Sequence, residues 1–464
     1  MTLRRGVLAL LFGLAFAGPA LGDVRIDSDP WLRVDCSTFT IYSNAGERRT
    51  RELARDLEKM SAALGTSILP QRGENRPTRL FFFRRSVSFD SYRDALLGTG
   101  SDKDGIFFSR PSGNFIIIDG GARGSHRVAL HELTHQLIHG SYGFVPLWVN
   151  EGMAGVFETF QLDGPRARAG RVERSDLQML KRARIPLDEL LTMNARSEDF
   201  LSGPRSRLVY AQTRLMMHYV LVGTPSRADR LPVYLDLLRA RTEPMEAFER
   251  AFGMSLRQFE GELVAYSHRK IHSMLTLQPE SAPVADSSPV PVPPAEIFAE
   301  LAGLLAEGGT NSLPAAESLV RASLDHDPAH SRAHVVLGLV HHRRGQLDAA
   351  LTAYEAALEL GSTDPLLPGR AGRVALRLSM NAPPEIRGDW LERAITFFRV
   401  TVERSPLDAG NWSALGVALA RRDQTRGEAR TAFETALKID PGNRTARVWL
   451  KRLDEGTGMS SRTE

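Results

Sequence analysis

A helical repeat in the last third of the chain constrains the fold more than any other feature. The segments 334–365 and 412–441 each contain a Leu-Gly pair, an aromatic residue with one alanine before it and one after it, and a closing proline. A more degenerate unit carries Ala394 and Phe398, and a weak first unit spans 295–328. Small residues at fixed positions let paired helices pack closely, and each pair buries its apolar face on the next. The sequence therefore predicts an all-α solenoid.

The spacing of these residues resembles the tetratricopeptide repeat (TPR), in which each unit is a pair of helices. The resemblance implies about four units over residues 298–450, followed by a disordered tail at 451–464. It also implies that the repeats bind a protein partner. A helical bundle without repeats is the alternative.

Two segments of unusual composition divide the rest of the chain. Residues 1–22 contain Arg4 and Arg5, an apolar run and small residues at the end, which is typical of a secretory signal peptide. An uncleaved membrane anchor is the alternative, although the run is shorter than the roughly 20 residues that a span needs. Residues 276–297 are rich in proline and serine and predict an extended linker. We therefore expect a periplasmic or secreted bacterial protein, with one domain at 23–275 and no membrane span after signal removal.

The region before the linker predicts an α+β fold. Apolar alternation at 32–44 and 78–85 predicts strands, and two apolar runs around a turn predict a hairpin at 104–120. Helical spacing predicts a helix at 46–64, and helices dominate 124–272. Because strands come first and helices follow, we expect an α+β domain rather than a βαβ repeat.

Charge and cysteine content exclude nucleic-acid binding as a function and an intramolecular disulfide as a source of stability. The net charge is only +4 and basic residues are interspersed with acidic ones, so no basic stripe for nucleic acid is present. Cys36 is the single cysteine, so no intramolecular disulfide can form and the fold depends on its core or on a metal. Cys36 lies in an apolar alternating segment, which indicates a buried structural thiol.

The stretch HELTH, residues 131–135, has the spacing of a metal site. His131 and His135 lie four residues apart, so a helix places both imidazoles on one face, with Glu132 beside them as a candidate general base. A catalytic zinc needs a third protein ligand, and Glu151 follows on the next predicted helix. Small residues after Glu151 favour close packing of the two helices. The alternative is a surface helix with two solvated histidines.

HELTH followed by LWVNEGMA resembles the gluzincin metallopeptidases, and the short spacing is similar to that of the bacterial peptidase MA-like family. Members of that family often carry tetratricopeptide repeats. The resemblance covers residues 30–272 and implies an α+β zincin-like fold. It also implies one Zn²⁺ per chain, with His131, His135 and Glu151 as ligands and Glu132 as the base acting on zinc-activated water.

The family implies one further group, a tyrosine that stabilises the oxyanion. Tyr210 lies in the stretch VYAQ on a later predicted helix and is the candidate, with Tyr142, Tyr219 and His218 as rivals. A core aromatic on an amphipathic helix is the alternative role of Tyr210.

The sequence departs from the gluzincin pattern behind the ligands. The position four residues after the third ligand, often an acid, is Gly155, and Glu158 is the remaining candidate to accept a hydrogen bond from a ligand histidine. His126 and His139 lack ligand spacing, and we expect both to be structural or solvated. No exopeptidase motif is evident, so cleavage within a chain is at least as favoured as removal of terminal residues.

The sequence therefore predicts an exported zinc metallopeptidase that hydrolyses peptide bonds, with repeats that recruit a protein partner or substrate. One alternative is a non-catalytic repeat scaffold with a zinc-binding peptidase-like domain. Another is hydrolysis of a different substrate, such as a cell-wall peptide.

Overall fold

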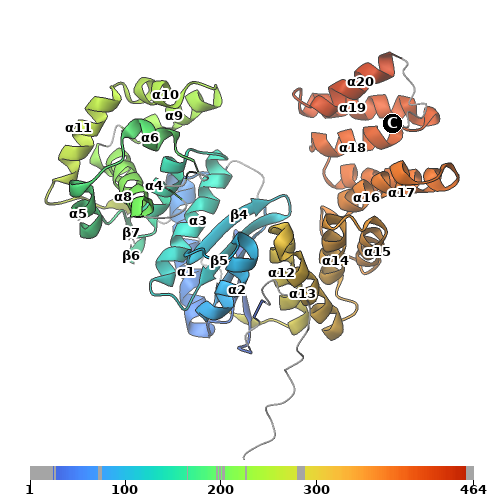
Figure 1. Cartoon of the computed structure of the whole chain (residues 1–464), viewed down its shortest axis with the longest axis horizontal. Helices are drawn as coiled ribbons and strands as arrows, with labels where there is room; N and C mark the ends of the chain where they lie inside the picture. Colours follow the sequence, from blue (N-terminus) through green and yellow to red (C-terminus); the bar gives the residue numbers. More distant parts are fainter. Residues whose placement is uncertain are drawn as a thin grey trace, which may run out of the picture.

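The computed structural model contains a mixed α/β region, a helical lobe and a stack of helix pairs (Figure 1). The strands are β1 (Leu32–Asp35), β2 (Phe39–Ser43), β3 (Thr78–Phe83), β4 (Gly105–Arg110), β5 (Gly113–Asp119), β6 (Gln161–Asp163), β7 (Arg166–Ala169), β8 (Leu275–Leu277) and β9 (Val290–Pro291). The helices before residue 278 are α1 (Glu47–Ser67), α2 (Ser86–Leu97), α3 (Ser125–Tyr142), α4 (Leu147–Phe157), α5 (Arg174–Arg182), α6 (Leu187–Thr192), α8 (Pro204–His218), η1 (Tyr219–Gly223), α9 (Arg230–Arg239), α10 (Pro244–Phe252) and α11 (Leu256–Ser267). The structure describes residues 24–25, 28–71, 76–164, 166–194, 197, 200, 204–224, 227–278 and 288–455.

The main sheet has six strands in the order β4-β5-β3-β2-β1-β9. The strands β2, β3 and β5 run parallel, while β1 and β4 pair antiparallel with their neighbours. The strands β1, β2 and β3 and the hairpin β4–β5 lie within the segments where the sequence predicts strands and a hairpin. The helix α1 links β2 to the parallel β3, so the sheet contains a βαβ unit, which the expectation of an α+β domain rather than a βαβ repeat did not include.

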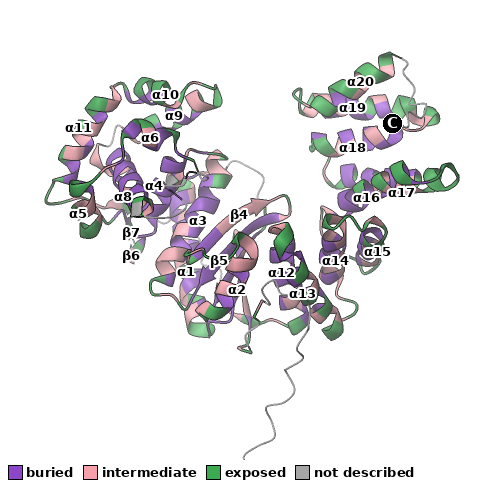
Figure 2. Cartoon of the chain, in the orientation of Figure 1, coloured by how far each residue is buried: buried purple, intermediate pink, exposed green. Residues whose placement is uncertain are grey.

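Strand alternation divides the sheet's side chains between two cores. On β3, Leu80 and Phe82 enter the core beneath α1 and α3, whereas Phe81 and Phe83 point to the opposite face. Every residue of β5 is buried, as expected for a strand covered on both faces (Figure 2). The apolar stripe of α1, including Leu57, is buried on the first face.

The second face of the sheet is covered by α2 and by the first helices after the predicted linker. These helices are α12 (Pro294–Glu307) and α13 (Leu313–His326), and they share one core with the sheet aromatics. The Glu300 carboxylate lies 2.8 Å from Arg79 Nε on β3 and 3.3 Å from Arg332 Nε. Within the predicted linker, β9 pairs with β1. The segment therefore does not hold two independent regions apart, because buried apolar and charged contacts join them.

Four consecutive helix pairs follow the sheet, as the repeat spacing predicts. The first pair is α12 and α13, with the short helix η3 (Thr310–Ser312) between them. It is followed by α14 (Ser331–Arg343), α15 (Leu347–Glu359), α16 (Leu367–Asn381), α17 (Pro384–Arg404), α18 (Ala409–Leu419), η4 (Asp423–Thr425) and α19 (Arg426–Ile439). A Cβ on Gly338 would lie 2.3 Å from the Tyr354 ring, and one on Gly416 would lie 2.6 Å from Phe433. The repeat glycines thus provide the close approach of paired helices.

A last helix, α20 (Arg444–Asp454), packs on the final pair. It includes residues 451–454, so the start of the predicted disordered tail is helical, and residues 456–464 lie outside the described residues. The predicted signal at 1–22 also lies outside them. No described helix is both long and apolar enough to cross a membrane.

The helices predicted over 124–272 form a lobe around α4 and α8, with a small sheet in the order β6-β7-β8 that the sequence analysis missed. Its strands have three to four residues each, too short for a clear alternation signal.

Candidate metal centre

Three side chains predicted as metal ligands converge between α3 and α4. The Nε2 atom of His131 lies 3.4 Å from Glu151 Oε2, and the Nε2 atom of His135 lies 3.8 Å from Glu151 Oε1. One ligand atom from each residue falls within 4.8 Å of the others. All three side chains are largely buried. The HELTH stretch and the downstream glutamate therefore form one polar cluster, as the spacing predicted.

Local sequence explains how the two helices bring these groups together. His131 and His135 share one face of α3, which ends at Tyr142 and is capped by Gly143 with a positive φ of 70°. The next helix starts directly after Pro146, so the connection is short and Glu151 lies in its second turn. This turn geometry places the Glu151 carboxylate opposite the two imidazoles.

The small residues after Glu151 have a different role from the one expected. A Cβ on Gly152 would lie 2.7 Å from the Thr213 carbonyl oxygen, and one on Gly155 would lie 2.9 Å from Arg214 Nε. Both neighbours belong to α8. The glycines therefore let α8 pack closely on α4, and the expectation that they bring α4 against α3 is corrected.

The donor set fits a zinc ion. Imidazole nitrogens and carboxylate oxygens bind Zn²⁺ at about 2.0–2.2 Å, so adjacent ligand atoms of a tetrahedral site lie about 3.3 Å apart. The separations of 3.4 and 3.8 Å from Glu151 to the histidines are close to this value.

Electrostatic interactions favour a protonated His131 and an ionised Glu151. Burial disfavours protonation of His131, but hydrogen bonds to Glu151 and Glu158 outweigh it and raise the pKa of His131 to about 10. Burial would raise the pKa of Glu151, but His135 and His131 outweigh it and lower that pKa. Without metal, a proton on His131 therefore balances the buried carboxylates, and a bound cation would replace that proton.

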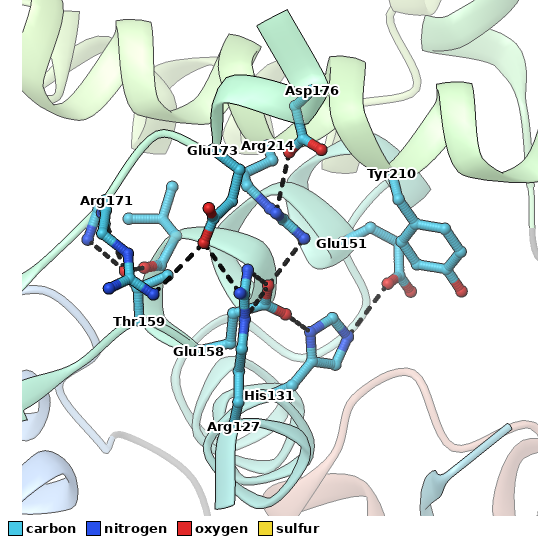
Figure 3. A network of polar contacts seen from close by, with 12 residues as sticks. Arg127, His131, Glu151, Glu158, Thr159, Arg171, Glu173, Asp176, Tyr210 and Arg214 are labelled. Carbon is cyan, nitrogen blue, oxygen red and sulfur yellow. Dashed lines mark hydrogen bonds and ion pairs between the residues drawn. The ribbon is translucent and has the colours of Figure 1, made fainter. Parts of the chain in front are cut away.

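Glu158 lies behind His131 and orients it (Figure 3). The Nδ1 atom of His131 is 2.8 Å from Glu158 Oε2, so Nδ1–H donates to the carboxylate and Nε2 faces Glu151. Glu158 is the acceptor that the sequence analysis named as the remaining candidate, seven residues after Glu151 on the same face of the chain. Such a partner fixes the tautomer and orientation of a ligand histidine.

Two arginines hold Glu158 in place. Arg127 approaches Glu158 Oε1 with Nε at 2.9 Å, and Arg214 Nη2 lies 2.7 Å from the same oxygen. Burial opposes ionisation of Glu158, but His131, Arg214 and Arg127 outweigh it and lower its pKa to about 2. The carboxylate is therefore charged throughout the neutral range.

The network extends to two outer acids that share these arginines. Arg127 Nη1 lies 2.9 Å from Glu173 Oε1, and Arg214 Nη1 lies 2.9 Å from Asp176 Oδ2 (Figure 3). None of these four residues was predicted from the sequence. Arg127 alone had a local signal, because it precedes His131 by four residues on one helical face.

Replacing Glu158 by glutamine should weaken zinc binding about 10–100-fold, because the amide cannot balance the imidazole and leaves two arginines without their shared carboxylate. Competition with a chromogenic chelator measures the affinity. Glu173→Gln is the matched control, since it removes an acid from the same network without touching His131. Equal affinities of the two variants would contradict the orienting role of Glu158.

His135 differs from His131 in the surroundings of its Nδ1 atom. Its Nδ1 is buried and accepts or donates no hydrogen bond within the described parts of the chain. His131 is therefore the more firmly oriented ligand of the pair.

Glu132 lies on α3 against the edge strand β4. A Cβ on Gly105 would lie 2.9 Å from Glu132 Cγ and 2.5 Å from Val128 Cγ1, so only glycine permits this approach. Glu132 is buried and is not one of the three converging groups. Its charge contributes to the raised pKa of His131, which indicates that the carboxylate lies near the cluster.

Tyr210 on α8 borders the cluster from the other side (Figure 3). Burial raises the pKa of its hydroxyl, and Glu151 and Glu132 raise it further. The phenol is therefore a neutral hydrogen-bond donor near both carboxylates. Its ring also contacts Phe200, with centroids 5.5 Å apart, so part of the side chain has the alternative packing role.

The rival residues are engaged elsewhere. Tyr142 donates to the Ile68 carbonyl oxygen at 3.2 Å, and the Tyr219 hydroxyl lies 2.5 Å from Glu262. His126 Nε2 lies 3.2 Å from Asp56, away from the three ligands. His139 is four residues beyond His135 and lines the cleft described below. Tyr210 is the candidate that the structure brings near the cluster.

His218, the last rival, is a buried structural residue. Tyr266 donates to its Nδ1 at 2.8 Å, and its Nε2–H donates to the Ser273 carbonyl oxygen at 3.1 Å. Both ring nitrogens are thus satisfied in the neutral form. Burial, with help from His272, lowers the pKa of His218 to about 4.

This pKa predicts an acid-sensitive stability. The pKa of His218 falls from 6.5 in the unfolded chain to about 4 on folding, so the unfolded chain binds more protons between these values. The stabilisation is complete above pH 6.5 and falls as the pH decreases toward 4, by on the order of 3 kcal/mol. Urea unfolding at pH 7.0 and 4.5 measures it. His218→Gln should lose less stability over this range than the wild type, and identical losses would contradict the assignment.

A cleft of about 1220 Å³ opens beside the cluster. His135 and Asn150 line it on the metal side, and its walls come from the ends of α3 and α4 and from α6, α9 and α10. Phe144, 92% exposed, stands at its edge. Most of the wall is apolar, as in sites that bind organic groups.

Comparisons with known proteins concern the repeats. Residues 302–365 match the tetratricopeptide repeat family, which confirms that prediction for this part of the chain. The comparison with curated proteins gives no match. The family match identifies a repeat scaffold of a kind that binds other proteins.

Several solved structures are similar at low identity. "MamA 41-end" from Desulfovibrio magneticus RS-1 has 16% identity, covers 37% of this chain and 99% of its own, and has a TM-score of 0.28. YrrB, "a TPR protein with an unusual peptide-binding site", has 21% identity over 34% and 92% of the two chains, with a TM-score of 0.22. The "APC/C hetero-tetramer Cut9-Hcn1" has 12% identity over 71% and 55%, with a TM-score of 0.29.

Proposed function

We propose that this protein is an exported zinc-dependent peptidase that hydrolyses peptide bonds, and that its repeats recruit a protein partner or substrate. The observation that carries the proposal is the convergence of His131, His135 and Glu151, with Glu158 oriented behind the first histidine. Structural zinc sites use four protein ligands, whereas catalytic sites use three and keep one position open. The group found among the described residues has three members.

The chain's own residues supply the remaining steps. A bound zinc ion would provide Lewis acidity and lower the pKa of water in the site. Glu132 accepts a proton from the attacking water and returns it to the leaving amine. Tyr210 donates a hydrogen bond to the developing oxyanion. The cleft beside His135 holds the substrate chain next to these groups.

Export rests on residues 1–22, whose charged start, apolar run and small terminal residues are those of a secretory signal. Fusion of residues 1–22 to a reporter that is active only outside the cytoplasm tests this part of the proposal. An inactive reporter would restrict the proposal to the peptidase itself.

A second candidate function is a repeat scaffold whose peptidase-like domain binds zinc without catalysis. The family match favours it, because that match falls within the repeats. Retention of Glu132 beside the ligands favours the peptidase, since a metal-binding relic has no use for a base.

The peptidase is tested with the mature chain, residues 23–464, loaded with zinc and incubated with labelled casein and with cell-wall peptides. We expect hydrolysis of one of these substrates, loss of activity with a chelator, and no activity in His135→Ala. Zinc bound at the site without hydrolysis of any substrate would favour the scaffold.

A further inference from the structure

The first helix of the third repeat carries three arginines on one face. Arg370, Arg373 and Arg377 lie three and four residues apart on α16, so their side chains leave the helix on the same side. His342 on α14 lies within electrostatic range of them, because burial and then these three arginines lower its pKa. The repeat stack therefore places four basic groups together at the α14–α16 junction.

Two of these cations have no acidic partner. Arg370 is buried and pairs with Glu307 at 2.9 Å. Arg373 and Arg377 are exposed, and neither makes an ion pair or hydrogen bond with any described residue. Two acids that act on Tyr354 or Arg373 have other partners: Asp364 lies 3.4 Å from Arg332, and Asp408 accepts from the first backbone N–H groups of α18.

A buried hydroxyl at the same place also lacks a partner. The Tyr354 side chain is fully buried, its ring lies against Gly338, and its hydroxyl makes no hydrogen bond within the described structure. Arg370 and Arg373 act on this hydroxyl, since both oppose the rise in its pKa that burial causes. A buried unpaired hydroxyl is costly, so its retention beside unpaired cations indicates a missing acceptor.

The helices that carry these groups form one side of the solenoid. Figure 1 shows α14 and α16 on the side turned toward the helical lobe, with α15 and α17 on the opposite side. The first helices of these two repeats therefore lie on the same side of the stack, and repeat solenoids bind extended chains on one such side.

We infer that the α14–α16 face, through Arg373, Arg377, His342 and Tyr354, binds an acidic segment of a partner protein. Glutamate and aspartate carboxylates match arginine forks in bidentate geometry and can also accept from the Tyr354 hydroxyl. The basic cluster is local and the chain's net charge is only +4, so a nucleic acid lacks the long stripe it requires. The inference deepens the recruitment role of the proposed function, but it concerns binding alone and survives if the protein hydrolyses nothing.

The test measures fluorescence anisotropy of a labelled hexaglutamate peptide with the mature wild-type chain at low salt. We expect saturable binding, and about tenfold or greater weakening in the Arg373→Gln/Arg377→Gln double variant. The matched control, Arg404→Gln/Lys438→Gln, removes the same charge from exposed positions on the second helices α17 and α19 and should bind within about twofold of the wild type. Labelled hexaglutamine should not bind.

Tyr354→Phe separates a binding role from a folding role. Removing an unpartnered buried hydroxyl should leave the unfolding temperature unchanged or higher, while hexaglutamate binding weakens measurably. Equal weakening in the control double variant would overturn the inference. Binding of hexaglutamine as strong as that of hexaglutamate, or stronger binding of a short DNA strand, would also overturn it.

Discussion

Replacing Glu132 by glutamine should lower the rate of peptide hydrolysis by about 10²–10⁴-fold and leave the zinc content unchanged. The glutamine amide has nearly the same shape and keeps the packing against Gly105, but it cannot accept the proton of the attacking water. Because Glu132 is not one of the three converging ligands, the metal should stay bound. Initial rates on labelled casein, normalised to zinc per chain, measure the effect.

The matched control for this variant is Glu173→Gln, an isosteric change in the outer part of the same polar network. It should retain most of the activity, since Glu173 contacts neither the ligands nor the reacting groups. A Glu132→Gln protein with full activity would reject the role of Glu132 as general base.

Truncation should show that the first repeat belongs to the core of the mixed α/β region. A chain ending at residue 278 lacks α12 and α13, which cover Phe81, Phe83 and the other aromatics on the second face of the sheet. Five large side chains are lost from this core: Ile297, Leu301, Leu304, Leu305 and Leu319. At about 1.5–3 kcal/mol each, their loss is comparable to the 5–15 kcal/mol stability of a whole domain.

We therefore expect residues 23–278 to aggregate or to lack a cooperative unfolding transition. Residues 23–362 keep two repeats, including the Val336 and Val340 contacts of α14, and should unfold cooperatively. Circular dichroism melts of both chains measure the difference. A soluble, cooperatively folded 23–278 chain would show that the two regions are independent, as the proline-rich composition of the linker first suggested.

The convergence of His131, His135 and Glu151 could be predicted because its signals are local. Two histidines four residues apart and a glutamate on the following helix need only a helix and a short turn to meet. The role of Glu158 was harder to predict, because it depends on the direction in which α4 runs. Arg214 could not be found, because it reaches Glu158 only after Gly152 and Gly155 let α8 pack on α4.

The fold shows the same division between local and long-range information. Strand and helix positions followed from apolar periodicity, and the repeats followed from their spacing. The parallel pairing of β2, β3 and β5 did not, since alternation within a strand says nothing about its neighbour's direction. The strand β9 has two residues in a proline-rich segment, and only its pairing with β1 identifies it.

The metal content of the mature chain, residues 23–464, tests the central claim most directly. The protein is purified without added metal, and its zinc is measured beside that of the His135→Ala variant by plasma mass spectrometry. The geometry predicts about one zinc per chain in the wild type and its loss in the variant. Wild-type protein that holds no zinc even after reconstitution would contradict the metal centre, and the tetratricopeptide scaffold would remain.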